Sequence, residues 1–300
     1  MNVIKKRNWF FALSLLVIIP GIYALFAWNL KLGIDFSGGT LWEIKFEKTV
    51  SPQELSTFLT KNGTEVGSAA STTNQSVLVR IKATDESKLN ELKEKVKNTY
   101  GPTQDIRLET VGPTVSKELT QKAFYLIVVT IAGIVSYITW AFRKVRKPAS
   151  PIAFAVCTIA ALIHDIIVVV GIFAILGHFA NVEVDSLFIT ALLTVLGFSV
   201  HDTIVVFDRI RENLRKYDDY SFEQVVNHSL LQTMARSLNT SITVILVLLA
   251  LLLFGGTTIQ NFVLALLIGV ISVTIGDLNV PDLSSCFLYS SATRCWSSLW

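Results

Sequence analysis

Six long apolar runs, separated by segments that hold most of the charge, constrain this chain more than any other feature of its sequence. Only 16% of its 300 residues are charged and 51% are hydrophobic, whereas globular domains carry about 25% charged residues. A helix rises about 1.5 Å per residue, so about twenty apolar residues cross the roughly 30 Å hydrocarbon core of a membrane. The sequence therefore predicts a polytopic α-helical membrane protein with six transmembrane helices, at about 9–29, 123–142, 152–177, 187–207, 237–254 and 259–276.

Lysine and arginine in the short connections set the predicted orientation. Basic residues precede the first run and gather in two of the short connections, whereas the other two short connections contain none. Because positively charged loops stay in the cytoplasm, both termini should be cytoplasmic. The predicted order is a cytoplasmic N-terminus with the first helix at 1–29, an external domain at 30–122, helices 2–6 at 123–276 with cytoplasmic loops at 143–150 and 207–236, and an atypical tail at 277–300.

The external segment has the pattern of a small α+β domain. Strand-like stretches alternate apolar and polar residues, and helix-like stretches carry apolar residues on one face. The predicted strands are 41–46, 65–69, 76–82 and 106–111, and the predicted helices are 52–61 and 85–100. This β-α-β-β-α-β order is the ferredoxin-like arrangement.

Composition also excludes some functions. A net charge of +3 is too small to indicate nucleic-acid binding. The three cysteines have no spacing typical of metal ligands. The sequence therefore predicts no metal and no cofactor.

Charged groups inside apolar spans are costly, so each is a candidate functional residue. Asp165 lies in the third run beside His164, Asp202 lies in the fourth run beside His201, and Arg236 opens the fifth run. Desolvation favours a protonated carboxylate and a nearby cation favours the charged form. A carboxylate such as Asp202, balanced against Arg236, can therefore take up and release a proton. The histidines titrate near neutrality and are candidates to pass protons along.

Structural roles remain open for all of these residues. Asp202 also fits one half of a structural ion pair, and Arg236 fits a snorkelling anchor at the membrane surface. Both histidines fit packing or hydrogen-bonding roles, and Asp165 fits an interhelical hydrogen bond. Asp208 and Arg209 follow the fourth run at helical spacing, which fits a solvated helix extension.

A glycine-rich segment follows the first run. Gly38 and Gly39 favour a tight turn and a close backbone approach, which makes the segment a junction between membrane and external domain. Phosphate binding is disfavoured because no Lys-Ser/Thr pair follows.

Three stretches resemble the SecD/SecF family of protein-export membrane proteins. They are residues 32–40, which include Asp35 and Phe36, residues 111–119, and residues 197–213. The Asp202-Thr203 pair, followed by Asp208-Arg209, and the short external domain are closer to the SecF branch than to the SecD branch.

The resemblance implies a non-enzymatic subunit without a cofactor, in the resistance-nodulation-division superfamily. Its expected partners are SecD, the SecYEG channel, SecA, YajC or YidC, membrane lipid and the translocating preprotein, but no nucleic acid. Its expected role is to use the proton-motive force for export across the bacterial cytoplasmic membrane, or the thylakoid membrane in a cyanobacterium. The resemblance puts the membrane carboxylate at Asp202, the arginine of the next span at Arg236, and a further family position at Asp165.

Two other functions fit the same spans. One is a proton-coupled small-molecule or lipid exporter of the same superfamily, although such exporters usually have more spans and larger external domains. The other is an intramembrane aspartyl protease using Asp165 and Asp202, although their His-Asp settings differ from those of that class. The tail at 277–300 departs from the family pattern, and a change of reading frame near residue 273 would explain it.

Overall fold

The computed structural model describes residues 7–47, 49–71, 76–82, 86–145, 151–217, 219–256 and 259–279. The chain forms two compact units, of which the smaller is Leu32–Phe124 and the larger contains the rest. The sequence predicts 30–122 for the small domain, so its predicted limits lie two residues earlier at each end. The predicted basic residues at 5, 6, 146 and 147 and most of the atypical tail lie outside the described residues.

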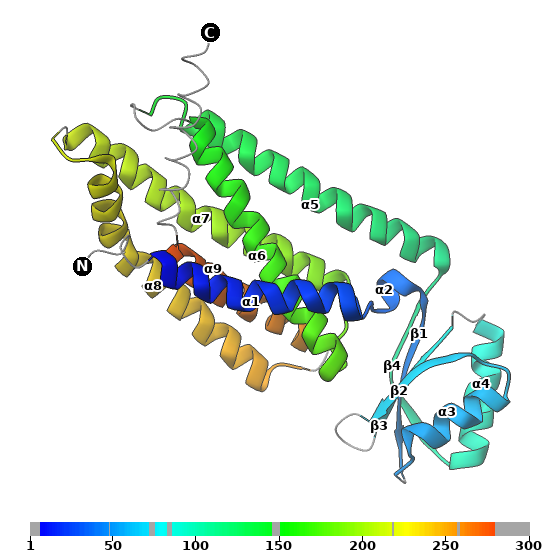
Figure 1. The fold of residues 1–300 in the computed structure, drawn as a ribbon. Helices are drawn as coiled ribbons and strands as arrows, with labels where there is room; N and C mark the ends of the chain where they lie inside the picture. Colours follow the sequence, from blue (N-terminus) through cyan, green and yellow to red (C-terminus); the bar gives the residue numbers. More distant parts are fainter. Residues whose placement is uncertain are drawn as a thin grey trace. The chain divides into compact units, whose positions relative to one another are not determined.

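The larger unit is built from long helices (Figure 1). They are α1 (Arg7–Trp28), α5 (Pro113–Ala141, which begins in the small unit), α6 (Pro151–Phe179), α7 (Ser186–Lys216), α8 (Phe222–Phe254) and α9 (Gln260–Asn279). Among the described residues, α5, α6, α7 and α8 are long and apolar enough to cross a membrane. The apolar parts of α1 and α9, Ala12–Trp28 and Gln260–Gly276, are shorter.

Aromatic packing joins three of these helices near one end of the bundle. Phe142, which follows α5, packs on Phe154 of α6 and Phe207 of α7, with ring centroids 5.3 and 5.7 Å away. Phe154 and Phe207 are themselves 4.4 Å apart. Of the most apolar stretch of α5, only 6% is buried inside the protein. Such exposed apolar helices are typical of proteins whose surface faces lipid.

Two glycines bring α1 and α6 into backbone contact. A Cβ atom added to Gly171 would lie 2.7 Å from the Cα of Gly21, and one added to Gly21 would lie 3.1 Å from the Cα of Gly171. Membrane helices approach this closely where small residues face each other. This crossing therefore requires glycine on both helices.

The segment predicted as the cytoplasmic loop 207–236 is mostly helical, as expected for the extension at Asp208 and Arg209. Residues up to Lys216 continue α7, and α8 begins at Phe222 after a short break. The Ser221 side chain accepts a hydrogen bond from the Gln224 N–H and the Gln224 side chain accepts one from the Ser221 N–H, a capping box that starts α8. The charge of this segment belongs to two solvated helix ends, because i,i+4 pairs such as Glu212–Lys216 support a helix.

The small unit is a four-stranded antiparallel sheet with two helices and a short helical turn. Its elements are α2 (Ile34–Ser37), β1 (Gly39–Phe46), α3 (Pro52–Lys61), β2 (Val66–Ser71), β3 (Ser76–Ile81), α4 (Glu86–Tyr100) and β4 (Thr103–Val111). The strands lie in the order β2-β3-β1-β4, so β2 and β4 form the edges. Each predicted strand and helix overlaps an observed one, whereas α2 was not predicted.

One face of the sheet carries the core of this unit. Alternate residues of β1, Trp42, Ile44 and Phe46, are at most 1% exposed, since successive strand side chains point to opposite faces. They pack in one cluster with apolar residues of α3 and α4, among them Leu55, Leu59, Leu89, Leu92 and Val96. The indole N–H of Trp42 donates to Asp105 of β4 at 2.8 Å, so this core also holds an edge strand.

The paired glycines make the turn from α2 into β1. Gly38 and Gly39 have φ values of +71° and +130°, which side-chain-bearing residues rarely adopt. A Cβ atom on Gly39 would lie 2.8 Å from the carbonyl oxygen of Ile81. Gly38 packs against the turn that leads into α5, where a Cβ would lie 3.4 Å from the Ser116 hydroxyl. The glycine pair therefore lets the backbone before β1 approach β3 and lie beside the start of α5.

Replacing Gly171 with leucine should separate α1 from α6. Overpacking of this kind costs about 1–3 kcal/mol or more, so we expect a lower thermal midpoint for the purified chain in detergent. Gly133→Leu is the matched control, because nothing lies within 4 Å of a Cβ at that position of α5. Equal midpoints for the two variants would contradict the backbone contact.

Replacing Gly39 with alanine should destabilise the small unit by about 1–2 kcal/mol, the usual cost of a strained left-handed conformation, with the Ile81 contact adding to it. Hydrogen exchange at the amides of β1 and β3 measures the effect. Gly112→Ala, at a glycine of ordinary φ with open space around it, should leave the exchange unchanged. Unchanged exchange in Gly39→Ala as well would refute the steric account.

Candidate functional site

Asp165 is enclosed among three helices. Its side chain is on α6, and the residue is 3% exposed. One carboxylate oxygen is 3.1 Å from Nδ1 of His164, and Nε2 of the same ring is 3.1 Å from the Ser14 hydroxyl of α1. A neutral ring that donates to Asp165 can accept from Ser14. The predicted His164-Asp165 pair is thus a hydrogen-bonded chain that reaches α1.

Asp202 lies on α7, which packs against α9. The residue is 7% exposed. Two turns earlier, Val195 occupies the space beside Gly269 of α9, where a Cβ would lie 2.2 Å from a Val195 methyl carbon. Helix α7 comes directly before α8 and α9 directly after it, each through a short connection, and both pack against α8. Helices α7 and α9 therefore run in the same direction. Asp202 therefore lies at the level of Gly276.

The carboxylate of Asp165 lies beside α9. A Cβ atom added to Gly276 would lie 3.5 Å from the Asp165 carboxylate oxygen, an ordinary van der Waals distance.

His201 and Arg236 have different surroundings from these carboxylates. Both residues are exposed in the isolated chain. Within the described residues, no hydrogen bond or ion pair joins Asp202 to Arg236, to His201 or to any other residue. The predicted Asp202–Arg236 balance is therefore not a direct contact in this structure. His201 also lacks the hydrogen-bonded role that His164 has.

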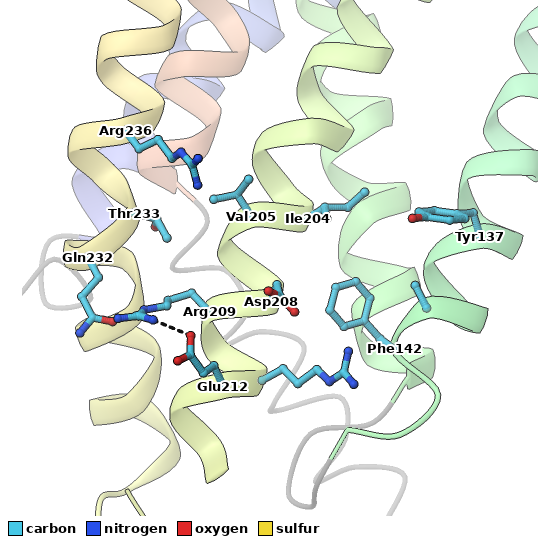
Figure 2. Close-up of a pocket in the computed structure, with 12 residues that line it drawn as sticks. Tyr137, Phe142, Ile204, Val205, Asp208, Arg209, Glu212, Gln232, Thr233 and Arg236 are labelled. Carbon is cyan, nitrogen blue, oxygen red and sulfur yellow. Dashed lines mark hydrogen bonds and ion pairs between the residues drawn. The ribbon is translucent and has the colours of Figure 1, made fainter. Parts of the chain in front are cut away.

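Arg236 instead lines a pocket between α5, α7 and α8 (Figure 2). The pocket has a volume of about 520 Å³. Asp208 and Arg209, the other two residues predicted from the fourth run, line it as well. The full lining is Tyr137, Ala141, Phe142, Ile204, Val205, Asp208, Arg209, Arg211, Glu212, Gln232, Thr233 and Arg236.

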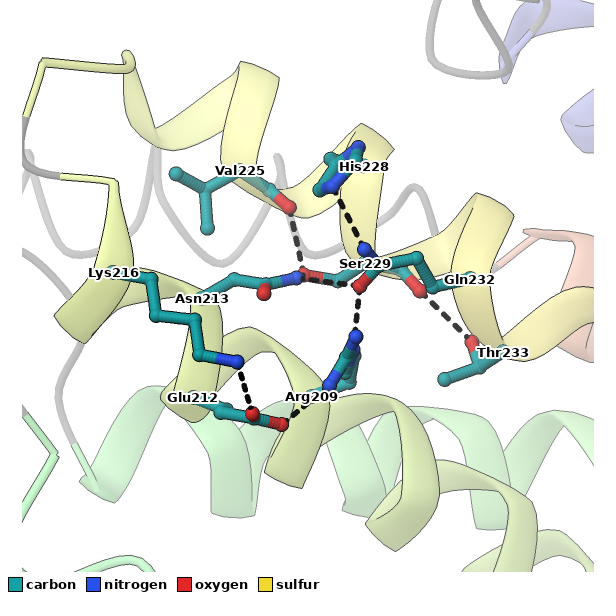
Figure 3. Close-up of polar contacts among 9 residues, drawn as sticks. All are labelled: Arg209, Glu212, Asn213, Lys216, Val225, His228, Ser229, Gln232 and Thr233. Carbon is teal, nitrogen blue, oxygen red and sulfur yellow. Dashed lines mark hydrogen bonds and ion pairs between the residues drawn. The ribbon is translucent and has the colours of Figure 1, made fainter.

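A polar network joins α7 to α8 beside this pocket (Figure 3). Asn213 of α7 is 1% exposed, and its amide donates to Ser229 at 2.8 Å and to Gln232 at 3.0 Å on α8. Gln232 also accepts from Arg209 and contacts His228. Arg209 and Lys216 both pair with Glu212. The network fixes how α7 and α8 lie side by side.

The sequence did not identify Asn213, Ser229, Gln232 and His228 as site residues. Their spacing gives a partial signal, since Arg209 and Asn213 are four residues apart on α7 and His228 and Gln232 are four apart on α8. Neither pattern shows that these two faces meet. Within the described chain, no group of three His, Cys, Asp or Glu residues could hold a metal ion.

Two family models match most of the chain. The model described as protein export membrane protein SecD/SecF, C-terminal, matches residues 91–281, and the SecD/SecF GG motif matches residues 30–50. The chain belongs to the SecD/SecF family. The resemblance seen in the sequence is thereby confirmed. The GG motif covers Asp35, Phe36, Gly38 and Gly39, and the larger match covers His164, Asp165, His201, Asp202, Asp208, Arg209 and Arg236.

Curated relatives agree with the SecF branch. The protein translocase subunit SecF of Thermobaculum terrenum is 47% identical over 291 residues, which cover 93% of this chain and 90% of that protein. The protein translocase subunit SecF of Anaerolinea thermophila is 38% identical over 300 residues, 99% of this chain and 96% of that protein.

Among solved structures, the chain is similar to SecDF from Thermus thermophilus, described as a translocon-associated membrane protein. The identity is 30% and the TM-score is 0.80 over 99% of this chain. This SecF-type chain spans only 39% of that SecDF chain.

Replacing Asn213 with alanine should loosen the α7–α8 hairpin. The hydroxyl of Ser229 and the amide of Gln232 would lose a buried partner, at a cost of about 1–3 kcal/mol. Thermal unfolding in detergent should show a lower midpoint than for Arg215→Ala, an exposed residue of the same helix end. Matching midpoints would mean that the network adds nothing to stability.

Proposed function

We propose that this chain is the SecF-type subunit of the accessory complex of the Sec preprotein translocase, and that it uses the proton-motive force to assist export. Family membership and the SecF-named relatives support the translocase role. The observation that carries the proton-coupling part is Asp202, a carboxylate on a membrane helix that is 7% exposed and lacks a polar partner within the described residues. Ionisable groups inside membrane helices are rare and are candidates for proton relays.

The finer architecture belongs to the same proposal. Six spans result if the shorter apolar stretches of α1 and α9 cross the membrane beside the four long ones. The β-α-β-β-α-β order and the antiparallel β2-β3-β1-β4 sheet support a ferredoxin-like external domain. Basic residues in the short connections support cytoplasmic termini in the bacterial cytoplasmic membrane.

The first proposed partner is SecD. The similar solved structure is of a SecDF chain, more than half of which extends beyond the part that this chain matches. In this protein we propose that a separate SecD subunit supplies the equivalent part. SecYEG, SecA, YajC or YidC and the translocating preprotein complete the proposed set of partners, on the family resemblance alone.

The coupling step uses two protonation states of Asp202. A charged carboxylate between α7 and α9 is unfavourable, so it draws cations or water toward it. A proton from outside converts it to the neutral acid, and α7 and α9 can then pack more closely. Asp165, with its His164–Ser14 chain, is the proposed neighbouring site for the same proton. Release on the cytoplasmic side restores the first packing.

The two other functions from the sequence have no support from the comparisons. The relatives are named as translocase subunits rather than exporters or proteases. An assay of Asp202→Asn separates the three functions, because the exporter and the protease would lose transport or peptide cleavage instead of export.

In vesicles that contain the chain and its partners, Asp202→Asn should abolish the stimulation of preprotein export by a proton gradient. Export should fall to the level seen in vesicles without the chain. Asparagine keeps the size of the side chain but cannot carry a proton. Asp219→Asn, an exposed carboxylate between α7 and α8, is the control and should export at the normal rate. Normal gradient-driven export by Asp202→Asn would exclude Asp202 as the carrier.

A further inference from the structure

Resting on the proposed function, we propose that Asp208 is a second counter-ion for Arg236, and that the guanidinium moves between Asp202 and Asp208 as Asp202 loses and gains its proton. Asp208 would then be a positioning residue that holds the cation when Asp202 is neutral. Both Asp208 and Arg236 line the same pocket between α5, α7 and α8. Within the described residues neither side chain has an ion-pair partner.

The contacts of the α7–α8 hairpin fix the level of Arg236. Asn213 bonds to Ser229, and Arg209 bonds to Gln232. Because the two helices are antiparallel, a step forward along α8 matches a step back along α7. Four residues beyond Gln232 on α8 is Arg236, and four residues before Arg209 on α7 is Val205. Figure 2 shows the Arg236 side chain extending toward Val205.

Val205 is the middle member of a row with an acid on each side. Asp202, Val205 and Asp208 are three residues apart in turn, and side chains three apart on a helix are neighbours. Each acid is displaced from Val205 by about 4.5 Å along the axis, at about 1.5 Å per residue. That distance is shorter than an extended arginine side chain. Both acids therefore lie within one helical turn of the residue toward which Arg236 extends.

The two acids differ in solvation, which gives the switch a direction. Asp202 is 7% exposed and Asp208 is exposed. A charged Asp202 gains most from the cation because it has little water around it. When Asp202 takes up a proton, that attraction is lost and Asp208 is the remaining carboxylate of the row. Arginine stays protonated throughout, so it does not carry the transported proton. That proton binds to Asp202 and is released from Asp202.

Two other charged groups of the pocket, Arg209 and Glu212, have partners of their own. Arg209 is held by Glu212 and Gln232, and Glu212 also by Lys216. Tyr137 of α5 contributes a neutral phenol. Arg211 remains, three residues after Asp208 on the same helix, and is the alternative partner for Asp208.

The test measures the coupling between Asp208 and Arg236 in the full chain. Thermal midpoints are compared for Asp208→Asn, Arg236→Gln and the double variant, each in the wild-type and in the Asp202→Asn background, since asparagine imitates the protonated acid. We expect non-additive midpoints in the Asp202→Asn background and nearly additive ones in the wild type. Additive midpoints in both backgrounds would overturn the proposal, as would equal coupling when Arg211→Gln replaces Arg236→Gln.

Export assays add a second readout. Asp208→Asn should reduce gradient-driven export about tenfold and shift its pH dependence, whereas Asp208→Glu should restore both and Arg215→Gln should change neither. Normal export by Asp208→Asn with loss of export by Asp202→Asn would sink this inference and leave the proposed function intact. Normal export by both variants would instead refute the proton-coupling function itself.

Discussion

The burial of two carboxylates between helices is the constraint on which the rest of this structure depends. Asp165 and Asp202 are 3% and 7% exposed, on helices that are long and apolar enough to cross a membrane. A charge in such a place is stabilised only by nearby dipoles, cations or protons. Asp165 has His164 and, through it, Ser14. Asp202 lacks such a chain among the described residues.

Small residues and polar contacts at other levels of the bundle make that burial possible. Gly21 and Gly171 join α1 to α6 by their backbones, and Gly269 receives a side chain from α7. At the far end of α7, Asn213 and its partners hold α8 in one register. The helices that carry the carboxylates are thus joined at other levels of the bundle as well.

Hydropathy and periodicity predicted much of the fold, because membrane spans and core faces are local patterns. The helices, the strands of the small unit and the buried positions of Asp165 and Asp202 follow from runs of residues that are close in sequence. For 207–236 the sequence predicted a cytoplasmic segment with a helix extension at Asp208 and Arg209, and the observed α7 continues to Lys216, where side-chain pairs such as Glu212–Lys216 support a helix. The Asp202–Arg236 pairing was also expected, yet the register of α7 against α8 puts Arg236 beside Val205. Register between helices depends on contacts such as Asn213–Ser229, which no local pattern reveals.

Strand β4 has an outer edge that no other described strand covers, and its nine residues are mostly exposed. An uncovered strand edge is a template for pairing with any extended chain, including another copy of itself. Along this edge, Asp105 pairs with Lys93 and Arg107 pairs with Glu109. Such charges oppose accidental sheet growth, because a second strand would have to displace or match them. If the small unit were produced alone, these four charged side chains would oppose its polymerisation through this edge.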